Sequence, residues 1–247
     1  MMGVDNGYAT EYRVRFDEAG ADGRLRAAGL LRYAQDVAWR HSEHLGFDRS
    51  WYTERGRWWV VRAVSVEVTA PVPMGATLRV ATAVIGHRRI WARRRVESSL
   101  EDGQPVAVVE TDWVILDERG RLGRIPPDFG VAFPNPELDA EPIRVDPPAA
   151  PADADRRSIA VARRDLDPMG HVNNGVYLDW FDEAIEAAGG ADDLHALPRR
   201  IRIEYAASAE PGDVLATATW RDGGRWWHRL ARDGDGTVLA RAVSEPG

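Results

Sequence analysis

The residues best suited to chemistry lie in one short stretch, Asp165-Leu-Asp-Pro-Met-Gly-His-Val-Asn-Asn174. It holds a carboxylate, Asp167, four residues before an imidazole, His171, with a proline and a glycine between them. A carboxylate and an imidazole on one tight loop can exchange protons with a bound water or substrate. The stretch therefore predicts acid–base chemistry or, as the simpler alternative, a turn rich in Asp and Asn that caps a helix.

A helix is expected directly after this loop, from about Asn174 to Ala188. Either Asn173 or Asn174 is a suitable N-cap. The free N–H groups at a helix N-terminus stabilise negative charge, so the loop would lie beside a position that can hold an oxyanion. The apolar residues of this helix recur at three- and four-residue spacing and share one face: Tyr177, Trp180, Phe181, Ala184, Ile185 and Ala188.

Composition excludes several classes of protein. The 247 residues include no Cys, which rules out disulfides, a cysteine nucleophile and thiolate metal sites. The net charge of −7 argues against general nucleic-acid binding. Neither a signal peptide nor an apolar run that could span a membrane is visible, so a cytoplasmic protein is expected. His41 and His44 lack evident carboxylate partners, and we expect no metal and no cofactor.

All 32 basic residues are Arg. We interpret this as codon bias, so that an arginine cluster such as Arg93-Arg-Arg95 carries little functional weight by itself.

The hydrophobic spacing predicts two rounds of the same elements, each with a long helix and several antiparallel strands. Residues 51–57 are expected to be a short connection. The predicted helices cover residues 27–45 and 174–188, and the predicted strands cover residues 11–16, 58–68, 77–85, 90–100, 106–116, 158–164, 200–205, 214–220, 225–231 and 237–244.

A proline-rich segment separates the two rounds. Eight prolines fall between Ile125 and Arg157, and no periodicity persists there, which indicates a partly extended linker. We therefore predict an α+β protein with an N-terminal domain over residues 1–125, a linker over 126–157 and a C-terminal domain over 158–247.

The two rounds align as a duplication. Gly23-Arg24-Leu25 aligns with Gly170-His171-Val172, and Gly20 then aligns with Asp167. The first copy therefore lacks both titratable groups at these positions. We predict one active site per chain, on the second copy, with the first copy contributing walls of the substrate pocket.

The pattern D-x-D-x-x-G-H-V-N-N before Tyr177 and a helix containing Trp180 resembles the hotdog-fold thioesterases. The tandem copies resemble, more specifically, the acyl-acyl carrier protein (ACP) thioesterases of plants and bacteria. The first copy matches through residues 15–24 and 30–35 and through Trp58-Trp-Val-Val61. The resemblance implies two tandem hotdog domains, each a long helix wrapped by a curved antiparallel sheet, and an enzyme of fatty acid biosynthesis.

The resemblance implies a thioester hydrolase that releases fatty acid from acyl-ACP. Asp167 would be the base or would hold the attacking water, and His171 would share that work or polarise the carbonyl. The backbone N–H near Asn174 would bind the oxyanion, and Asn173 would hold the loop. The family usually has Asn where this chain has Met169, and Glu at the place of Ser208. Both positions belong to the predicted substrate-binding set, together with Trp58 and Trp59.

The substrate partner is expected to be an ACP or CoA thioester. Because the chain is acidic and ACP is acidic too, only a local basic patch could receive ACP. The alternatives are an acyl-CoA thioesterase, a non-catalytic acyl-binding hotdog protein and, third, a hotdog hydratase. A monomer or a homodimer is compatible with two copies in one chain. The candidates for the basic patch are Arg199, Arg200 and Arg202, or Arg88 and Arg89.

Overall fold

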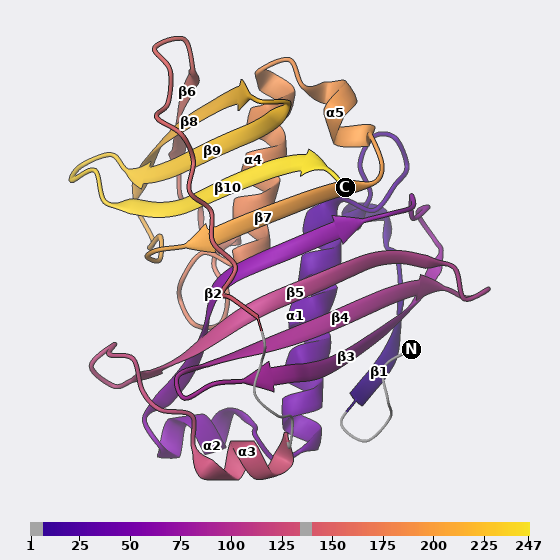
Figure 1. Cartoon of the computed structure of the whole chain (residues 1–247), viewed down its shortest axis with the longest axis vertical. Coiled ribbons are helices and arrows are strands. Elements are labelled where there is room, and N and C mark those ends of the chain that lie inside the picture. Colours follow the sequence, from indigo (N-terminus) through magenta and orange to yellow (C-terminus); the bar gives the residue numbers. More distant parts are fainter. Residues whose placement is uncertain (1–6, 134–139) are drawn as a thin grey trace. The chain divides into compact units, whose positions relative to one another are not determined.

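The computed structural model describes residues 7–133 and 140–247, which form two compact units (Figure 1). The first unit consists of residues 1–64 and 70–142, and the second of residues 65–69 and 143–247. Two of the eight linker prolines, Pro134 and Pro136, lie outside the described residues. No helix in the described part of the chain is long and apolar enough to cross a bilayer.

The first unit has one long helix against a five-stranded sheet (Figure 1). The strands follow the order β1-β3-β4-β5-β2, with antiparallel pairing of β1 with β3, β3 with β4 and β4 with β5. The unit also has two short helices, α2 between α1 and β2 and α3 after β5. The elements are β1 (Gly7–Arg13), α1 (Ala27–His44), α2 (Arg49–Glu54), β2 (Arg57–Val68), β3 (Thr77–His87), β4 (Trp91–Leu100), β5 (Pro105–Asp117) and α3 (Pro127–Ala132).

The second unit repeats this arrangement. Its strands follow the order β7-β10-β9-β8-β6, with antiparallel neighbours throughout. The long helix buries the apolar face that the spacing predicts. The elements are β6 (Asp155–Ala160), α4 (Asn174–Ala187), α5 (Ala191–His195), β7 (Arg199–Tyr205), β8 (Val214–Asp222), β9 (Arg225–Arg232) and β10 (Val238–Pro246).

The loop before each long helix has the same backbone hydrogen bonds. The Gly20 N–H donates to the Arg24 carbonyl at 2.8 Å. The Asp167 N–H donates to the His171 carbonyl at 2.9 Å, 147 residues later. A 3₁₀ helix precedes each loop, η2 (Phe16–Glu18) and η3 (Arg163–Asp165). The two loops therefore share a backbone hydrogen-bond pattern at the offset of 147 residues that the sequence alignment gives.

Several elements differ from the prediction. The expected linker contains α3, which begins with Pro127 in its first turn, where a missing N–H costs nothing, and buries Phe129. The predicted connection at residues 51–57 overlaps α2 (Arg49–Glu54), which the Asp48 carboxylate caps by accepting from the Trp51 N–H at 2.9 Å. The strand predicted at 158–164 ends at Ala160 and the strand predicted at 11–16 lies at 7–13.

Candidate active site

The loop Asp167–Gly170 is a tight turn that places Asp167 and His171 at its two ends. The Gly170 N–H donates to the Asp167 carbonyl at 2.9 Å, and Gly170 has a φ of +81°, a conformation that glycine adopts without a Cβ penalty. The Asp167 Oδ1 accepts a hydrogen bond from the Met169 N–H at 2.8 Å. The backbone turn therefore holds the carboxylate in one orientation.

The side chains at the tip of this turn are accessible. His171 is exposed, and its ring forms no hydrogen bond within the described residues. Met169 is 51% exposed. An imidazole that is not engaged by the protein is free to contact a substrate or a water molecule.

The N-terminus of α4 follows three residues after the turn. Asn173 is the N-cap, because its Oδ1 accepts from the Gly175 N–H at 2.9 Å and its carbonyl accepts from the Val176 N–H at 2.9 Å. The Asn174 N–H has no partner among the described residues. Tyr205 donates from its hydroxyl to the Asn174 carbonyl at 2.9 Å, which orients this peptide group. One donor at the helix N-terminus is therefore available to a developing oxyanion.

Tyr177 is a part of the site that the sequence reasoning assigned only to the apolar helix face. Its hydroxyl accepts a hydrogen bond from the buried Ala209 N–H at 2.9 Å, and burial raises the pKa of Tyr177 to about 12. The Ala209 carbonyl accepts in turn from the Val172 N–H at 3.2 Å. This places the segment carrying the exposed Ser208 beside the loop. The sequence signal for this role was a hydroxyl-bearing tyrosine, rather than a phenylalanine, on an otherwise apolar helix face.

Asp165 has a structural role. It is buried, and its Oδ2 accepts from the Ala162 N–H at 2.7 Å, which caps the 3₁₀ helix η3. Its carbonyl accepts from the Asn173 N–H at 2.9 Å. Of the two aspartates in the loop, only Asp167 lies within the turn that leads to His171.

The predicted substrate-binding tryptophans belong to the first unit. Trp58 and Trp59 are half-buried on β2 and pack against a cluster of buried apolar residues. The ring of Trp59 lies 5.0 Å from that of Phe129. The other predicted site residues all lie in the second unit. The buried cluster consists of Phe47, Tyr52, Val84, Ala92, Phe129 and Phe133.

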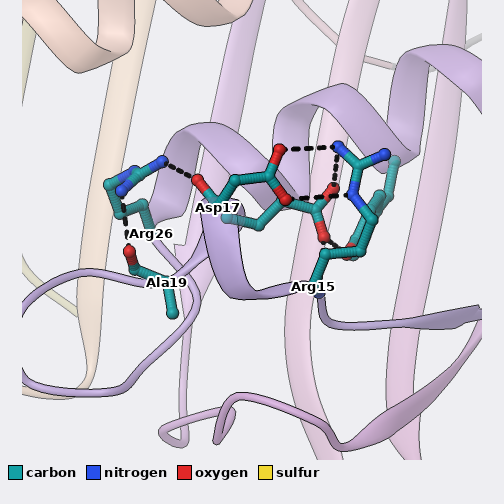
Figure 2. Close-up of polar contacts among 6 residues, drawn as sticks. Arg15, Asp17, Ala19 and Arg26 are labelled. Atoms are coloured by element: carbon teal, nitrogen blue, oxygen red, sulfur yellow. Dashed lines mark hydrogen bonds and ion pairs between the residues drawn. The ribbon is translucent and has the colours of Figure 1, made fainter.

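The equivalent loop of the first unit has different chemistry (Figure 2). Arg26, which aligns with Asn173, donates from its guanidinium to the carbonyls of Asp17 at 2.6 Å and Ala19 at 2.8 Å (Figure 2). Arg15 pairs with the Asp17 carboxylate at 3.3 Å. Arginine side chains therefore hold the first loop, through backbone carbonyls and through the Asp17 carboxylate. This loop has Gly20 in the place of Asp167.

A turn elsewhere in the chain has the same form as the Asp167 turn. The Asp117 N–H donates to the Arg121 carbonyl and the Gly120 N–H donates to the Asp117 carbonyl, both at 2.9 Å. The Asp117 Oδ1 accepts from the Arg119 N–H at 2.9 Å. Because Asp117 lies in a strand connection of the first unit, this geometry by itself does not identify a catalytic aspartate.

Of the first predicted basic patch, Arg199 does not lie on the surface. Arg199 is 5% exposed and donates to the Asp182 carboxylate and to Ser244. Arg200 pairs with Glu67 at 2.9 Å, and Arg202 pairs with Glu245 at 2.9 Å. Side chains alternate along β7, so Arg199 points into the core with Ile201 and Ile203. The cluster of arginines in the sequence does not show this alternation. Arg88 and Arg89 are exposed.

No group of three or more His, Cys, Asp or Glu side chains that could hold a metal ion occurs among residues 7–133 and 140–247.

Two family models match the chain. The acyl-ACP thioesterase N-terminal domain matches residues 5–132, and the acyl-ACP thioesterase C-terminal domain matches residues 149–243. The chain belongs to the acyl-ACP thioesterase family, whose members are thioester hydrolases. The resemblance noted in the sequence is thereby confirmed.

Individual relatives agree with this family. The chain is 22% identical over 232 residues to oleoyl-acyl carrier protein thioesterase 2 of Arabidopsis thaliana, covering 86% of this chain and 62% of that protein. It therefore spans less than two thirds of the length of that relative. It is also 27% identical over 217 residues to an uncharacterised protein of Mycobacterium tuberculosis, covering 84% of this chain and 80% of the relative.

Solved structures give the fold. A 12:0-ACP thioesterase from Umbellularia californica superimposes with a TM-score of 0.80 at 21% identity, covering 99% of this chain and 98% of that chain. An acyl-ACP thioesterase from Bacteroides thetaiotaomicron superimposes with a TM-score of 0.81 at 18% identity, covering 97% of each chain. The chain thus has a hotdog-type fold.

Proposed function

We propose that this protein hydrolyses an acyl-ACP thioester to free fatty acid and ACP, with one active site at the start of α4. The observation that carries the proposal is the arrangement of the second loop. A turn there presents the Asp167 carboxylate and the His171 imidazole three residues ahead of a capped helix with an available N–H at Asn174. Membership of the thioesterase family supports the same reaction.

The proposed reaction begins with a water molecule held by Asp167. As the water oxygen attacks the thioester carbonyl, Asp167 takes its proton, and the carbonyl oxygen becomes an oxyanion. The Asn174 N–H stabilises that oxyanion and His171 polarises the carbonyl or holds the water. Collapse of the intermediate breaks the carbon–sulfur bond, and the proton passes to the leaving thiolate. The products are a fatty acid and the free thiol.

We further propose that the two units are tandem hotdog domains. The repeated hydrogen bonds around Gly20 and Asp167 and the equal strand orders support two copies of one fold. The domain limits at residues 1–125 and 158–247, with a linker over 126–157, remain a prediction. A role in fatty acid biosynthesis, a cytoplasmic location and a monomeric or homodimeric state also remain predictions.

Two alternatives differ from this proposal, one in the carrier of the acyl chain and one in whether the protein is catalytic at all. An acyl-CoA thioesterase would use the same loop with a smaller leaving group. The likeness of the Asp167 turn to the Asp117 turn favours the other alternative, a non-catalytic acyl-binding protein, because the Asp167 carboxylate then has only a structural task.

The experiment that tests this function measures thiol release from matched acyl-ACP and acyl-CoA substrates with wild type, Asp167→Asn and Asp117→Asn. Asn retains the oxygen that accepts from the Met169 N–H but cannot act as a base, so Asp167→Asn separates the turn from the chemistry. We expect a loss of about a hundred-fold or more for Asp167→Asn and near wild-type rates for Asp117→Asn.

Equal rates in the two variants would show that Asp167 is not the base. If the wild type retained acyl chains without releasing thiol, the protein would be an acyl-binding protein and not a hydrolase. A higher kcat/KM on CoA than on ACP substrates would assign the enzyme to acyl-CoA.

A further inference from the structure

Two buried tyrosines of the second unit, Tyr177 on α4 and Tyr205 on β7, bind backbone groups beside the candidate site. They are 5% and 7% exposed, and their rings meet edge to face with 5.2 Å between the ring centres. The Tyr205 hydroxyl donates to the Asn174 carbonyl at 2.9 Å. The Tyr177 hydroxyl accepts from the Ala209 N–H at 2.9 Å. Neither hydroxyl takes part in the proposed reaction.

The hydrogen bonds of Tyr177 lead through Ala209 to the backbone beside His171. The Ala209 carbonyl accepts from the Val172 N–H at 3.2 Å, and Val172 directly follows His171. Ala209 is fully buried, and it binds the tyrosine with its N–H and the loop with its carbonyl. A displacement of Ala209 relative to Tyr177 would therefore also displace the peptide next to the imidazole.

The segment that contains Ala209 is also held on both sides of this residue. The Ala206 N–H donates to the Leu239 carbonyl at 2.7 Å. The Glu210 N–H donates to the Asp213 carboxylate at 3.0 Å. The segment is therefore a fixed support for the loop that carries His171.

The first copy has the same backbone contact between its loop and the end of its strand. Leu25 aligns with Val172 at the offset of 147 residues. Past the long helices, the alignment of β2 with β7 gives an offset of 137 residues, at which Val72 aligns with Ala209. The Leu25 N–H donates to the Val72 carbonyl at 2.8 Å, as the Val172 N–H does to the Ala209 carbonyl. The contact is therefore a feature of both copies.

Both hydroxyls are missing from the first copy. Leu30 aligns with Tyr177, and Val68 at the end of β2 aligns with Tyr205 at the end of β7. Leu30 is 2% exposed, so an apolar side chain fills the equivalent buried place. The backbone contact of the first copy thus forms without a tyrosine hydroxyl. The hydroxyls occur only in the copy that carries the candidate site.

We propose that Tyr177 is a positioning residue for hydrolysis, which fixes the loop at His171 through the backbone of Ala209. This inference rests on the proposed function. Without the hydroxyl, the buried Ala209 N–H loses its acceptor, and the segment shifts to find another. The loop follows this shift, and the imidazole leaves the place from which it polarises the carbonyl or holds the water. The hydroxyl therefore serves the reaction rather than the fold.

The first test is the kinetics of Tyr177→Phe, which keeps the ring and removes the hydroxyl. We expect kcat to fall about ten-fold with KM unchanged, the effect of one lost hydrogen bond on the transition state. Tyr33→Phe is the matched control, because Tyr33 of α1 is similarly buried and its hydroxyl donates to Glu18 at 2.5 Å in the first unit. Its kcat should equal that of wild type. Equal kcat values for the two variants overturn the proposal.

A double-mutant cycle tests whether Tyr177 acts through the imidazole. In a His171→Ala background, Tyr177→Phe should change kcat little further, because the effects of residues that act as a unit are not additive. Tyr205→Phe should still lower kcat in that background, since its hydroxyl holds the Asn174 peptide. An equal loss from Tyr177→Phe with and without the imidazole would overturn a role through His171.

A readout without turnover separates this inference from the proposed function. The NMR signals of the His171 imidazole should shift in Tyr177→Phe and stay in place in Tyr33→Phe. Unchanged signals overturn the proposal, and so does a Tyr177→Phe variant that does not fold, because the hydroxyl would then serve the fold. If the wild type releases no thiol, the proposed function fails, and the NMR comparison still decides whether Tyr177 positions His171.

Amide hydrogen exchange in the wild type tests the contact itself and needs no variant. Slow exchange of the Ala209 N–H supports its hydrogen bond to Tyr177. Exchange as fast as that of an exposed amide would show that the link to the loop does not exist, and it would overturn the proposal.

Discussion

Single side chains in this protein combine a local backbone role with a proposed chemical one. Asn173 caps α4 through Oδ1, and its N–H donates to the Asp165 carbonyl at 2.9 Å, which joins the two ends of the loop. Asp48 caps α2 in the same way, by accepting from the Trp51 N–H, in a place without predicted chemistry. The two caps therefore allow the structural and the functional contributions to be separated.

Replacement of Asn173 by Ala should lower the free energy of unfolding by about 1 kcal/mol, because a helix N–H loses its acceptor. Asp48→Ala should cost a similar amount. Only Asn173→Ala should also reduce thiol release at a temperature where both variants are folded, since the Asn174 N–H moves with the cap. Chemical denaturation and steady-state kinetics on both variants provide the check. Equal activities would limit Asn173 to capping.

The element that positions the site is the turn, and it occurs in both units. Gly170 and Gly23 occupy equivalent places with φ of +81° and +74°, and a Cβ added to either would meet no atom within 4 Å. A substitution at either glycine therefore introduces backbone strain without a steric clash. The same substitution at the two glycines can therefore be compared directly, because His171 follows one turn and Arg24 follows the other.

We expect Gly170→Ala and Gly23→Ala each to destabilise the protein by about 1–2 kcal/mol, the cost of a left-handed conformation for a residue with a Cβ. Gly170→Ala should additionally lower kcat, because a shifted turn displaces His171 and the Asp167 carboxylate. Thermal unfolding and thiol-release kinetics would measure both effects. A larger loss of activity in Gly23→Ala would point to the first loop as the site of chemistry.

At the scale of the whole molecule, two buried histidines couple folding to pH. His228 on β9 is 3% exposed and shares a hydrogen bond of 2.7 Å with Thr219, and burial lowers its pKa from 6.5 to about 4. The pKa of His41 in the first unit is lowered to about 4 as well. Each unit therefore holds a neutral imidazole in its interior.

Stability should fall as the pH is lowered from about 6.5 to about 4. In this window the unfolded chain binds a proton at His228 and the folded chain does not, so acid favours unfolding. Above pH 6.5 the imidazole is neutral in both states, and burial of His228 costs no stability. The loss is at most about 3 kcal/mol for each histidine. Urea unfolding at a series of pH values would measure it. His228→Gln should flatten the profile, and an unchanged slope in that variant would exclude His228 as the cause.

The sequence by itself determined the elements whose signals are local. Hydrophobic spacing located both long helices and most strands, because the period of an element depends on its own residues. The pair of glycines and the offset between Arg24 and His171 also located the repeated loop. Short capped segments such as α2 and α3 were missed, although Asp48 and Pro127 are start signals, because six residues are too few for a period to emerge.

Only the tertiary structure decided which groups meet. The hydrogen bond from Ala209 to Tyr177 and the burial of Arg94 beside His41 join residues 32 and 53 positions apart. Strand alternation sends Arg93 and Arg94 to opposite faces, and only the pairing of β4 with its neighbours establishes which face is buried. Such contacts depend on long-range pairing and burial, which composition and spacing do not encode residue by residue.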